Sequence, residues 1–330
     1  METPSKPIKS LAVLCSGGDS SGMNPAIRSV VRTAIGLGID IYGIHQGYTG
    51  LLEGNIEKLS LSSVSNIIQR GGTILDTSRC LDFHNAEVRQ EAAHLLARKH
   101  IDGLIVIGGN GSFTGAMNLN KEHDFPVIGI PATIDNDISG TQYTIGFNTA
   151  VQTAIEAVDK IRDTASAHSR TFLVEVMGRT ASSIALQVGL CTGAEQVVLS
   201  NQAVDYQAIV DNINKGKARG KTSSIIIVAE GEKAGLSYQI KDTLQAQYSL
   251  GVHVCILGHI QRGGSPTAID RTIASKMGYA AVHALYEGNH AHVTAFNNGD
   301  VQIVPLSDCL GKKTDISEES QLKLIRALAI

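Results

Sequence analysis

The chain has 330 residues, enough for two domains, and 43% of them are hydrophobic. Its formal net charge is −3, aromatic residues make up 4% and tryptophan is absent, so no nucleic-acid-binding surface is expected. The N-terminal METPSKPIKS lacks the apolar core of a signal peptide, and no run approaches a membrane span. The sequence therefore predicts a cytoplasmic protein without a membrane partner.

The five cysteines form no CxxC pair, and most lie in apolar segments. Reduced, unreactive thiols are a better interpretation than a metal site. They are Cys15, Cys80, Cys191, Cys255 and Cys309.

The first predicted strand covers residues 10–15 and is followed by the glycine-rich segment 16–22. Helical periodicity then runs through residues 23–37. This is the order of a phosphate-binding turn, although it matches neither a Walker loop nor GxGxxG. Arg28 and Arg32 share one face of this helix and form either a solvated surface or one wall of an anion site.

Residues 101–137 repeat this order. A β-branched run at 104–107 predicts a buried strand, and Gly108, Gly109 and Gly111 follow it before a helix predicted at 113–120. A second strand at 127–130 leads to Asp135 and Asp137, which in an extended chain would point the same way. The unit predicts a phosphate cradle that faces acids able to hold Mg²⁺ or take a proton. Two ordinary turns with aspartate caps are the alternative.

The remaining segments continue the alternation of helix and strand. Helices are predicted at 87–100 and 147–163, and strands at 171–176, 225–229 and 252–257, each strand ending at polar residues. A capping box, Asp315-x-x-Glu318, opens a last helix that reaches residue 330. The pattern is typical of an α/β fold with mainly parallel sheets.

Five motifs in this order and spacing resemble the bacterial ATP-dependent 6-phosphofructokinase family from about residue 8 to beyond 300. They are SGGD at 16–19 with GMN at 22–24, GGNGS at 108–112, PATIDND at 131–137, MGR at 177–179 and GHIQRGGSP at 258–266.

This resemblance implies two αβα three-layer domains with the active site in the cleft between them. Residues 1–146 and 259–310 would form the nucleotide-binding domain, and 147–258 and 311–330 the sugar-phosphate-binding domain. It also implies a homotetramer whose sugar sites are completed across subunits, ATP as co-substrate and Mg²⁺ as cofactor.

The resemblance also assigns roles to single residues. Asp135 would be the base, with Thr133 beside the transferred phosphoryl group and Arg79 and Arg179 steadying charge. The nucleotide would lie on Gly18, Arg79, Cys80, Gly109, Asn110, Gly111, Ser112 and Gly115, and the metal on Asn110 and Asp137. The sugar phosphate would contact Thr133, Asp135, Asp137, Arg170, Met177, Gly178, Arg179, Glu230, His253, His259 and Arg262. An effector would bind Arg28, Arg32, Arg162, Glu195, Arg219 and Lys221.

Several positions depart from the family pattern. Asn110 stands where the family has Asp near the metal, and His253 where a neighbouring subunit supplies Arg to the sugar phosphate. Ala132 and Ser182 replace glycines. In the effector pocket, Leu61 replaces Arg and Asn66 replaces Asp.

The sequence thus predicts an ATP-dependent kinase that converts fructose 6-phosphate to fructose 1,6-bisphosphate in glycolysis. ATP is favoured over pyrophosphate because the pyrophosphate-using branch has Asp at the position of Gly111 and Lys at that of Ala132. The alternatives are a weakly active or inactive regulatory paralogue, which would join a mixed oligomer, and a kinase for another sugar phosphate.

Overall fold

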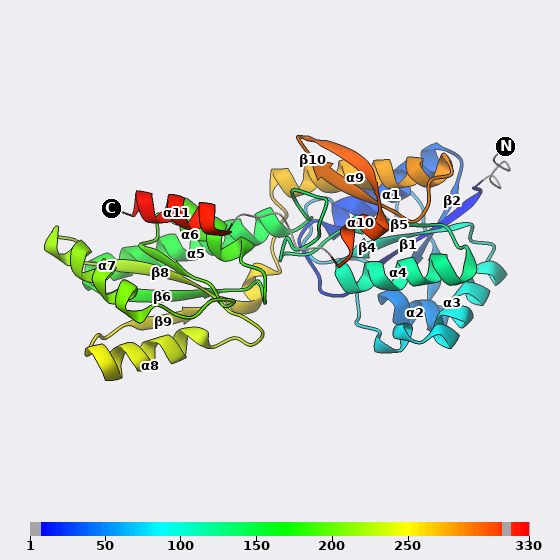
Figure 1. The fold of residues 1–330 in the computed structure, drawn as a ribbon. Coiled ribbons are helices and arrows are strands. Elements are labelled where there is room, and N and C mark those ends of the chain that lie inside the picture. The colour runs from blue at the N-terminus through cyan, green and yellow to red at the C-terminus, as the bar shows by residue number, and fades with distance from the viewer. Residues whose placement is uncertain (1–7, 312–317, 330) are drawn as a thin grey trace. The chain divides into compact units, whose positions relative to one another are not determined.

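The computed structural model describes residues 8–311 and 318–329, and they form two compact units (Figure 1). Among the described residues, the larger unit comprises 8–133, 137–148 and 262–311. The smaller unit comprises 134–136, 149–261 and 318–329. The chain therefore passes between the units several times, and each is described below by itself.

The larger unit is built on a sheet that has seven strands within residues 8–311, in the order β11-β10-β5-β4-β1-β2-β3. Neighbouring strands are parallel except for the two edge pairs, β2 with β3 and β10 with β11. The strands are β1 (Ser10–Ser16), β2 (Asp40–Ile44), β3 (Ile56–Lys58), β4 (Gly103–Gly108), β5 (Val127–Pro131), β10 (His292–Asn297) and β11 (Asp300–Pro305). Both β1 and β4 are buried along their whole length, as central strands of a parallel sheet should be.

Helices cover both faces of this sheet. Alternate residues of β1 and β4 point to opposite faces, so Val13 and Ile105 pack with α1 and α9, whereas Leu14 and Val106 pack with α2, α3 and α4. The helices of this unit are α1 (Met23–Gly36), α2 (Gly47–Glu53), η1 (Leu81–His84), α3 (Ala86–Arg98), α4 (Asn110–His123), α9 (Ala268–Tyr286) and α10 (Leu306–Cys309).

The smaller unit has a parallel sheet in the order β7-β8-β6-β9 within the described residues. Its strands are β6 (Thr171–Val176), β7 (Gln196–Val198), β8 (Ser224–Ala229) and β9 (His253–Ile256). On one face, Leu173 and Ile226 pack with α7 and α8. On the other, α6 packs with α11 and β7 so closely that a Cβ on Gly189 would lie 2.2 Å from Val197. The helices are α5 (Phe147–Ala167), α6 (Ser183–Thr192), α7 (Tyr206–Ala218), α8 (Leu236–Tyr248), η2 (Gly258–Gln261) and α11 (Glu318–Leu328).

The structure confirms the predicted α/β class, and helices lie on both faces of each sheet (Figure 1). The strand predicted at 171–176 has those bounds, and the strands predicted at 10–15 and 225–229 are each one residue longer. The edge strand β3 and its neighbour β2 were not predicted. The proposed Asp315 cap and the predicted end at residue 330 lie outside the described residues.

Among the described residues, no helix combines the length and apolarity needed to cross a membrane. Two of the cysteines, Cys15 and Cys309, are buried. Burial raises the pKa of the Cys15 thiol to about 12, even though it accepts a hydrogen bond from Thr73, so this thiol stays protonated at neutral pH.

Candidate active site

The two glycine-rich turns lie side by side between β1 and β4, where the order of strands in the sheet reverses. The chain runs from β1 to β2 on one side and from β4 to β5 on the other, and β1 and β4 are neighbours. Ligands of open α/β sheets bind at the carboxyl ends of strands at such a switch point. Ser112 donates from its hydroxyl to the Ser16 carbonyl at 3.0 Å, which joins the two turns directly.

The segment that carries Arg79 is bound to the first turn. The Gly17 amide donates to the Ser78 carbonyl at 3.1 Å, and the Thr77 hydroxyl donates to the Gly17 carbonyl at 3.0 Å. Arg79 is exposed and Cys80 is half-buried next to it. The structure therefore brings Gly18, Arg79 and the start of α4 together within the larger unit.

Helix α4 begins at Asn110, three residues earlier than predicted, with Gly109 as its N-cap. Gly111 and Ser112 therefore belong to the first helical turn, whose free amide groups favour an anion. A Cβ on Gly111 would meet nothing within 4 Å, so this glycine leaves open space. A Cβ on Gly115 would instead lie 2.9 Å from the Phe83 ring, so Gly115 serves helix packing.

The acidic segment is not extended, which corrects the extended conformation from which Asp135 and Asp137 were expected to point the same way. Residues 134–135 form a turn, and Asn136 adopts a left-handed conformation with φ of 49°. Asn tolerates that region better than most residues. The turn follows β5, and the hydroxyl of Thr144 holds the Thr133 carbonyl at 2.6 Å.

Asn110 and Asp137 are neighbours. The amide nitrogen of Asn110 donates to a carboxylate oxygen of Asp137 at 3.0 Å and to its carbonyl at 3.3 Å. Within residues 8–311 and 318–329, no group of three or more His, Cys, Asp and Glu side chains is placed to hold a metal. The Asp137 carboxylate and the Asn110 amide oxygen fit Mg²⁺, which usually takes one or two carboxylates and completes its shell with water and substrate phosphates.

The smaller unit carries a second cluster at the carboxyl ends of β6 and β8. The Arg179 amide donates to the Glu230 carboxylate at 3.3 Å, and the Arg179 carbonyl accepts from Ser200 at 3.3 Å. Gly178 and Arg179 both have positive φ, 142° and 50°. A left-handed arginine is uncommon, and such conformations gather at functional sites. Met177 is buried beneath this turn, and His259 is exposed in η2, after the carboxyl end of β9.

Two of the predicted sugar-phosphate ligands lie at the opposite end of the same sheet. Arg170 directly precedes β6, and His253 begins β9 opposite Phe172, with ring centroids 5.2 Å apart. Both side chains are exposed. The six residues of β6 span roughly 20 Å and separate this pair from Met177 and Arg179.

The predicted effector residues of the smaller unit also lie at the amino ends of its strands. Arg162 donates to the Thr192 carbonyl at 2.6 Å, and Glu195 forms an ion pair with Lys221 while accepting from the Ile225 amide. Arg219 is exposed just after α7. The other two, Arg28 and Arg32, lie on α1 of the larger unit, half-buried and exposed respectively.

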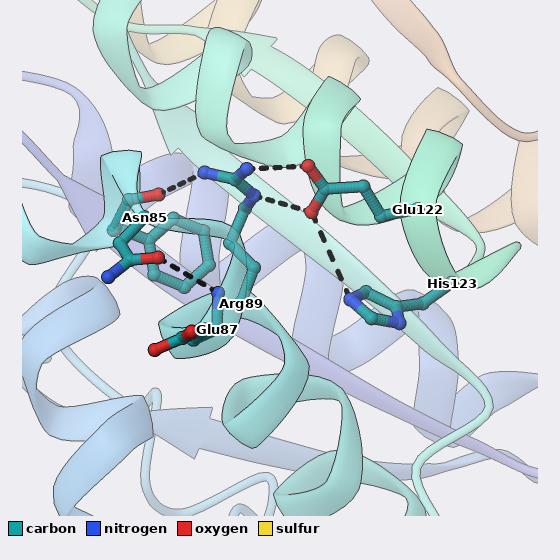
Figure 2. A network of polar contacts seen from close by, with 6 residues as sticks. Asn85, Glu87, Arg89, Glu122 and His123 are labelled. Atoms are coloured by element: carbon teal, nitrogen blue, oxygen red, sulfur yellow. Dashed lines mark hydrogen bonds and ion pairs between the residues drawn. The ribbon is translucent and has the colours of Figure 1, made fainter.

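The sequence did not predict the contacts that hold α4 in place. Tyr48 stacks on Phe83 with centroids 3.8 Å apart and donates to the Ser112 carbonyl at 2.7 Å. Arg89 binds the Phe83 carbonyl at 2.7 Å and pairs with Glu122 near the other end of α4 (Figure 2). These partners are 33 or more residues apart, except Phe83 and Arg89, and no local pattern indicates them.

Comparison with known proteins shows the family of the chain. Residues 10–285 match the family model described as phosphofructokinase. The chain is 48% identical over 327 residues to ATP-dependent 6-phosphofructokinase 1 of Thermus thermophilus, with 98% of this chain and 100% of that protein covered. It is 47% identical over 323 residues to the ATP-dependent 6-phosphofructokinase of Shouchella clausii, with coverage of 98% and 100%.

Solved structures of phosphofructokinases have the same fold as this chain. Phosphofructokinase from Saccharomyces cerevisiae superposes with a TM-score of 0.83 and 32% identity, over 91% of this chain and 44% of that longer chain. A pyrophosphate-dependent phosphofructokinase from Nitrosospira multiformis has a TM-score of 0.84 at 20% identity, over 97% of this chain and 91% of that one, which bears on the fold alone. With the family model and these relatives covering nearly its whole length, the chain belongs to the phosphofructokinase family.

Proposed function

We propose that this protein transfers the terminal phosphoryl group of ATP to the 1-hydroxyl of fructose 6-phosphate, in glycolysis and in the cytoplasm. The observation that carries the proposal is the end-to-end similarity to relatives named ATP-dependent 6-phosphofructokinase, at 47–48% identity. The clustered glycine turns and Arg79 of the larger unit give it a physical basis, because they offer amide groups and a guanidinium to phosphates. A coupled assay with ATP, Mg²⁺ and fructose 6-phosphate tests it.

Asp135 is proposed as the base. A sugar hydroxyl is a weak nucleophile, and a carboxylate beside it can accept its proton as the new P–O bond forms. The oxygen of the 1-hydroxyl attacks the terminal phosphorus, the bond to the leaving oxygen of ADP breaks, and the proton passes to Asp135. Thr133 would contact the transferred group, while Arg79 and Arg179 would balance its negative charge.

Asp137 and Asn110 are the residues that would hold Mg²⁺, each with an oxygen to offer. When bound, the ion would neutralise the negative charge of the substrate phosphates. Asn110 brings no charge of its own, so Asp137 supplies the formal negative charge of this pair.

We expect Asn110→Asp to bind Mg²⁺ more strongly and to raise kcat. Without the ion, the new carboxylate would face Asp137 at a distance where Asn110 now donates a 3.0 Å hydrogen bond, and like charges repel. Mg²⁺ should therefore raise the melting temperature of the variant by more than that of the wild type, in thermal scans without nucleotide. Asn110→Ala is the control, and an equal Mg²⁺ response in all three proteins would contradict the assignment.

ATP is the proposed phosphoryl donor because Gly111 leaves open the space into which the α-phosphate of ATP would extend. Gly111→Asp should fold normally, since its Cβ meets no atom and an acidic residue suits the first turn of a helix. The added charge should repel the nucleotide phosphates and lower kcat/KM for ATP by about tenfold or more. Gly111→Ala is the control, because it adds a side chain without adding a charge. Comparable wild-type turnover with pyrophosphate would refute the donor choice.

We further propose that the protein works as a homotetramer in which sugar sites are shared between copies. The separation of Arg170 and His253 from Arg179 and Glu230 by the length of β6 supports this, because both groups cannot contact one sugar phosphate within the same chain. Strand β9 is also an edge strand with exposed His253 and Ile256, so a second copy can reach it. Light scattering of the purified protein checks the assembly.

His253→Arg should lower the KM for fructose 6-phosphate. A guanidinium is always charged and binds phosphate with two parallel hydrogen bonds, whereas a neutral imidazole donates one. The expected gain is about 10-fold, from a charged hydrogen bond of roughly 1.5 kcal/mol or more. His168→Arg, on the exposed surface of the same unit, is the control. An unchanged KM with an intact tetramer would place His253 outside the sugar-phosphate site.

A further inference from the structure

The side chain of Arg262 lies against the first glycine turn of the larger unit. Its guanidinium donates from one nitrogen to the Asp19 carbonyl at 3.1 Å. A Cβ built on Gly18 would lie 2.6 Å from that nitrogen and 3.3 Å from the central carbon of the guanidinium. Only a residue without a side chain lets the guanidinium occupy this position.

The backbone next to Arg262 is attached to the same turn. The Ser21 hydroxyl donates to the carbonyls of Arg262 and Gly264, at 3.3 and 2.9 Å. The segment is therefore held both through its main chain and through the Arg262 side chain. A shift of residues 18–21 would carry the guanidinium with it.

We propose that Gly18 is a positioning residue for the sugar phosphate, which it serves by seating the Arg262 guanidinium against the nucleotide turn. The inference rests on the proposed function, in which Gly18 lines the nucleotide and Arg262 contacts the sugar phosphate. A guanidinium has five N–H groups. The bond to Asp19 fixes one of its nitrogens and thereby the direction of the remaining donors. Gly18 thus links the two substrate sites through one side chain.

The local backbone does not itself require glycine at this position. Gly17 has φ of 94°, but Gly18 is not among the glycines with positive φ, so alanine fits its conformation. The atoms that a Cβ would displace belong to the far end of a flexible side chain, which can rotate away. Gly18→Ala should consequently fold and move the guanidinium, rather than disrupt the unit.

A double-mutant cycle tests the link. Wild type, Gly18→Ala, Arg262→Lys and the double variant are compared by their KM for fructose 6-phosphate, their KM for ATP and their melting temperatures. Lysine keeps the charge but cannot reproduce the guanidinium geometry. Introduced into the wild type, Gly18→Ala should raise the KM for fructose 6-phosphate about fivefold or more. Introduced into the Arg262→Lys variant, it should leave that KM nearly unchanged, because substitutions of interacting residues do not have additive effects.

Gly36→Ala is the matched control, because Gly36 lies in α1 of the same unit, outside both proposed substrate sites, and its Cβ would meet nothing within 4 Å. It should leave the sugar KM within about twofold, in keeping with the additivity of unlinked sites. Independent effects of Gly18→Ala and Arg262→Lys, or a Gly18→Ala effect confined to the ATP KM, would overturn the link. A wild type without turnover of fructose 6-phosphate would instead overturn the proposed function on which it rests.

Discussion

Replacing Asp135 by asparagine should lower kcat by about 100- to 10,000-fold, the contribution typical of a general base. The amide has nearly the shape of the carboxylate but cannot accept the proton of the 1-hydroxyl. The KM for fructose 6-phosphate should change far less, because an amide oxygen can still accept a hydrogen bond from the sugar. Steady-state kinetics with both substrates varied separates the two constants.

The matched control is Asp159→Asn, the same chemical change at an exposed position of α5. It should leave kcat and both KM values unchanged. If Asp135→Asn kept the kcat of the wild type, another group would have to accept the proton. Loss of the folded state would be recognised by its melting temperature and by the assembly size.

The second large effect is on stability. Glu122→Gln should lower the free energy of unfolding by about 3 kcal/mol, because it leaves a buried guanidinium without its counter-charge. Arg89 is 5% exposed and Glu122 32% exposed, and two hydrogen bonds of 2.7 and 2.5 Å join them (Figure 2). Urea unfolding of both proteins at pH 7 measures the difference. Lys323→Met, which breaks the exposed pair with Glu319, should have little effect.

The same pair predicts a pH dependence. The hydrogen bond from Arg89, with its positive charge, holds the pKa of the Glu122 carboxyl below its usual value of 4.5. A carboxyl whose pKa is lowered by folding stabilises the protein above 4.5, and this stabilisation is lost as the pH falls through the lowered value. The stability difference between wild type and Glu122→Gln should therefore shrink below pH 4.5. A difference that stayed constant down to pH 3 would exclude the ion pair as its cause.

Much of the fold could be predicted because local signals agree with it. Residues 104–107 are β-branched or leucine without charge, and they form the buried core of β4. The start of α4 could not be predicted, because Asn110 and Gly111 have poor helix propensity and the helix is fixed there by Ser16 and Tyr48, 96 and 64 residues from Ser112. Strand β2 was missed because it is short and contains Gly43, which is required where Leu75 packs 2.7 Å from the position of a Cβ.

The candidate site divides in the same way. The glycine turns and their neighbours follow strand ends that the sequence marks clearly, so their grouping was predictable. The turn at Asp135 was not, since the left-handed Asn136 breaks an apparently extended segment. Nor was the seat of Arg262 on the first glycine turn, because Arg262 is 243 residues from Asp19 and only the folded chain brings them together.

The central claim is that the protein phosphorylates fructose 6-phosphate with ATP. The most direct measurement is a coupled assay of the purified wild type with ATP, Mg²⁺ and fructose 6-phosphate, with Asp135→Asn as the blank. We predict equal amounts of ADP and fructose 1,6-bisphosphate, saturation in both substrates and loss of turnover in the blank. A folded, assembled protein that binds both ligands without forming product would contradict the claim and favour a regulatory subunit, whereas turnover with a different sugar phosphate alone would reassign the substrate.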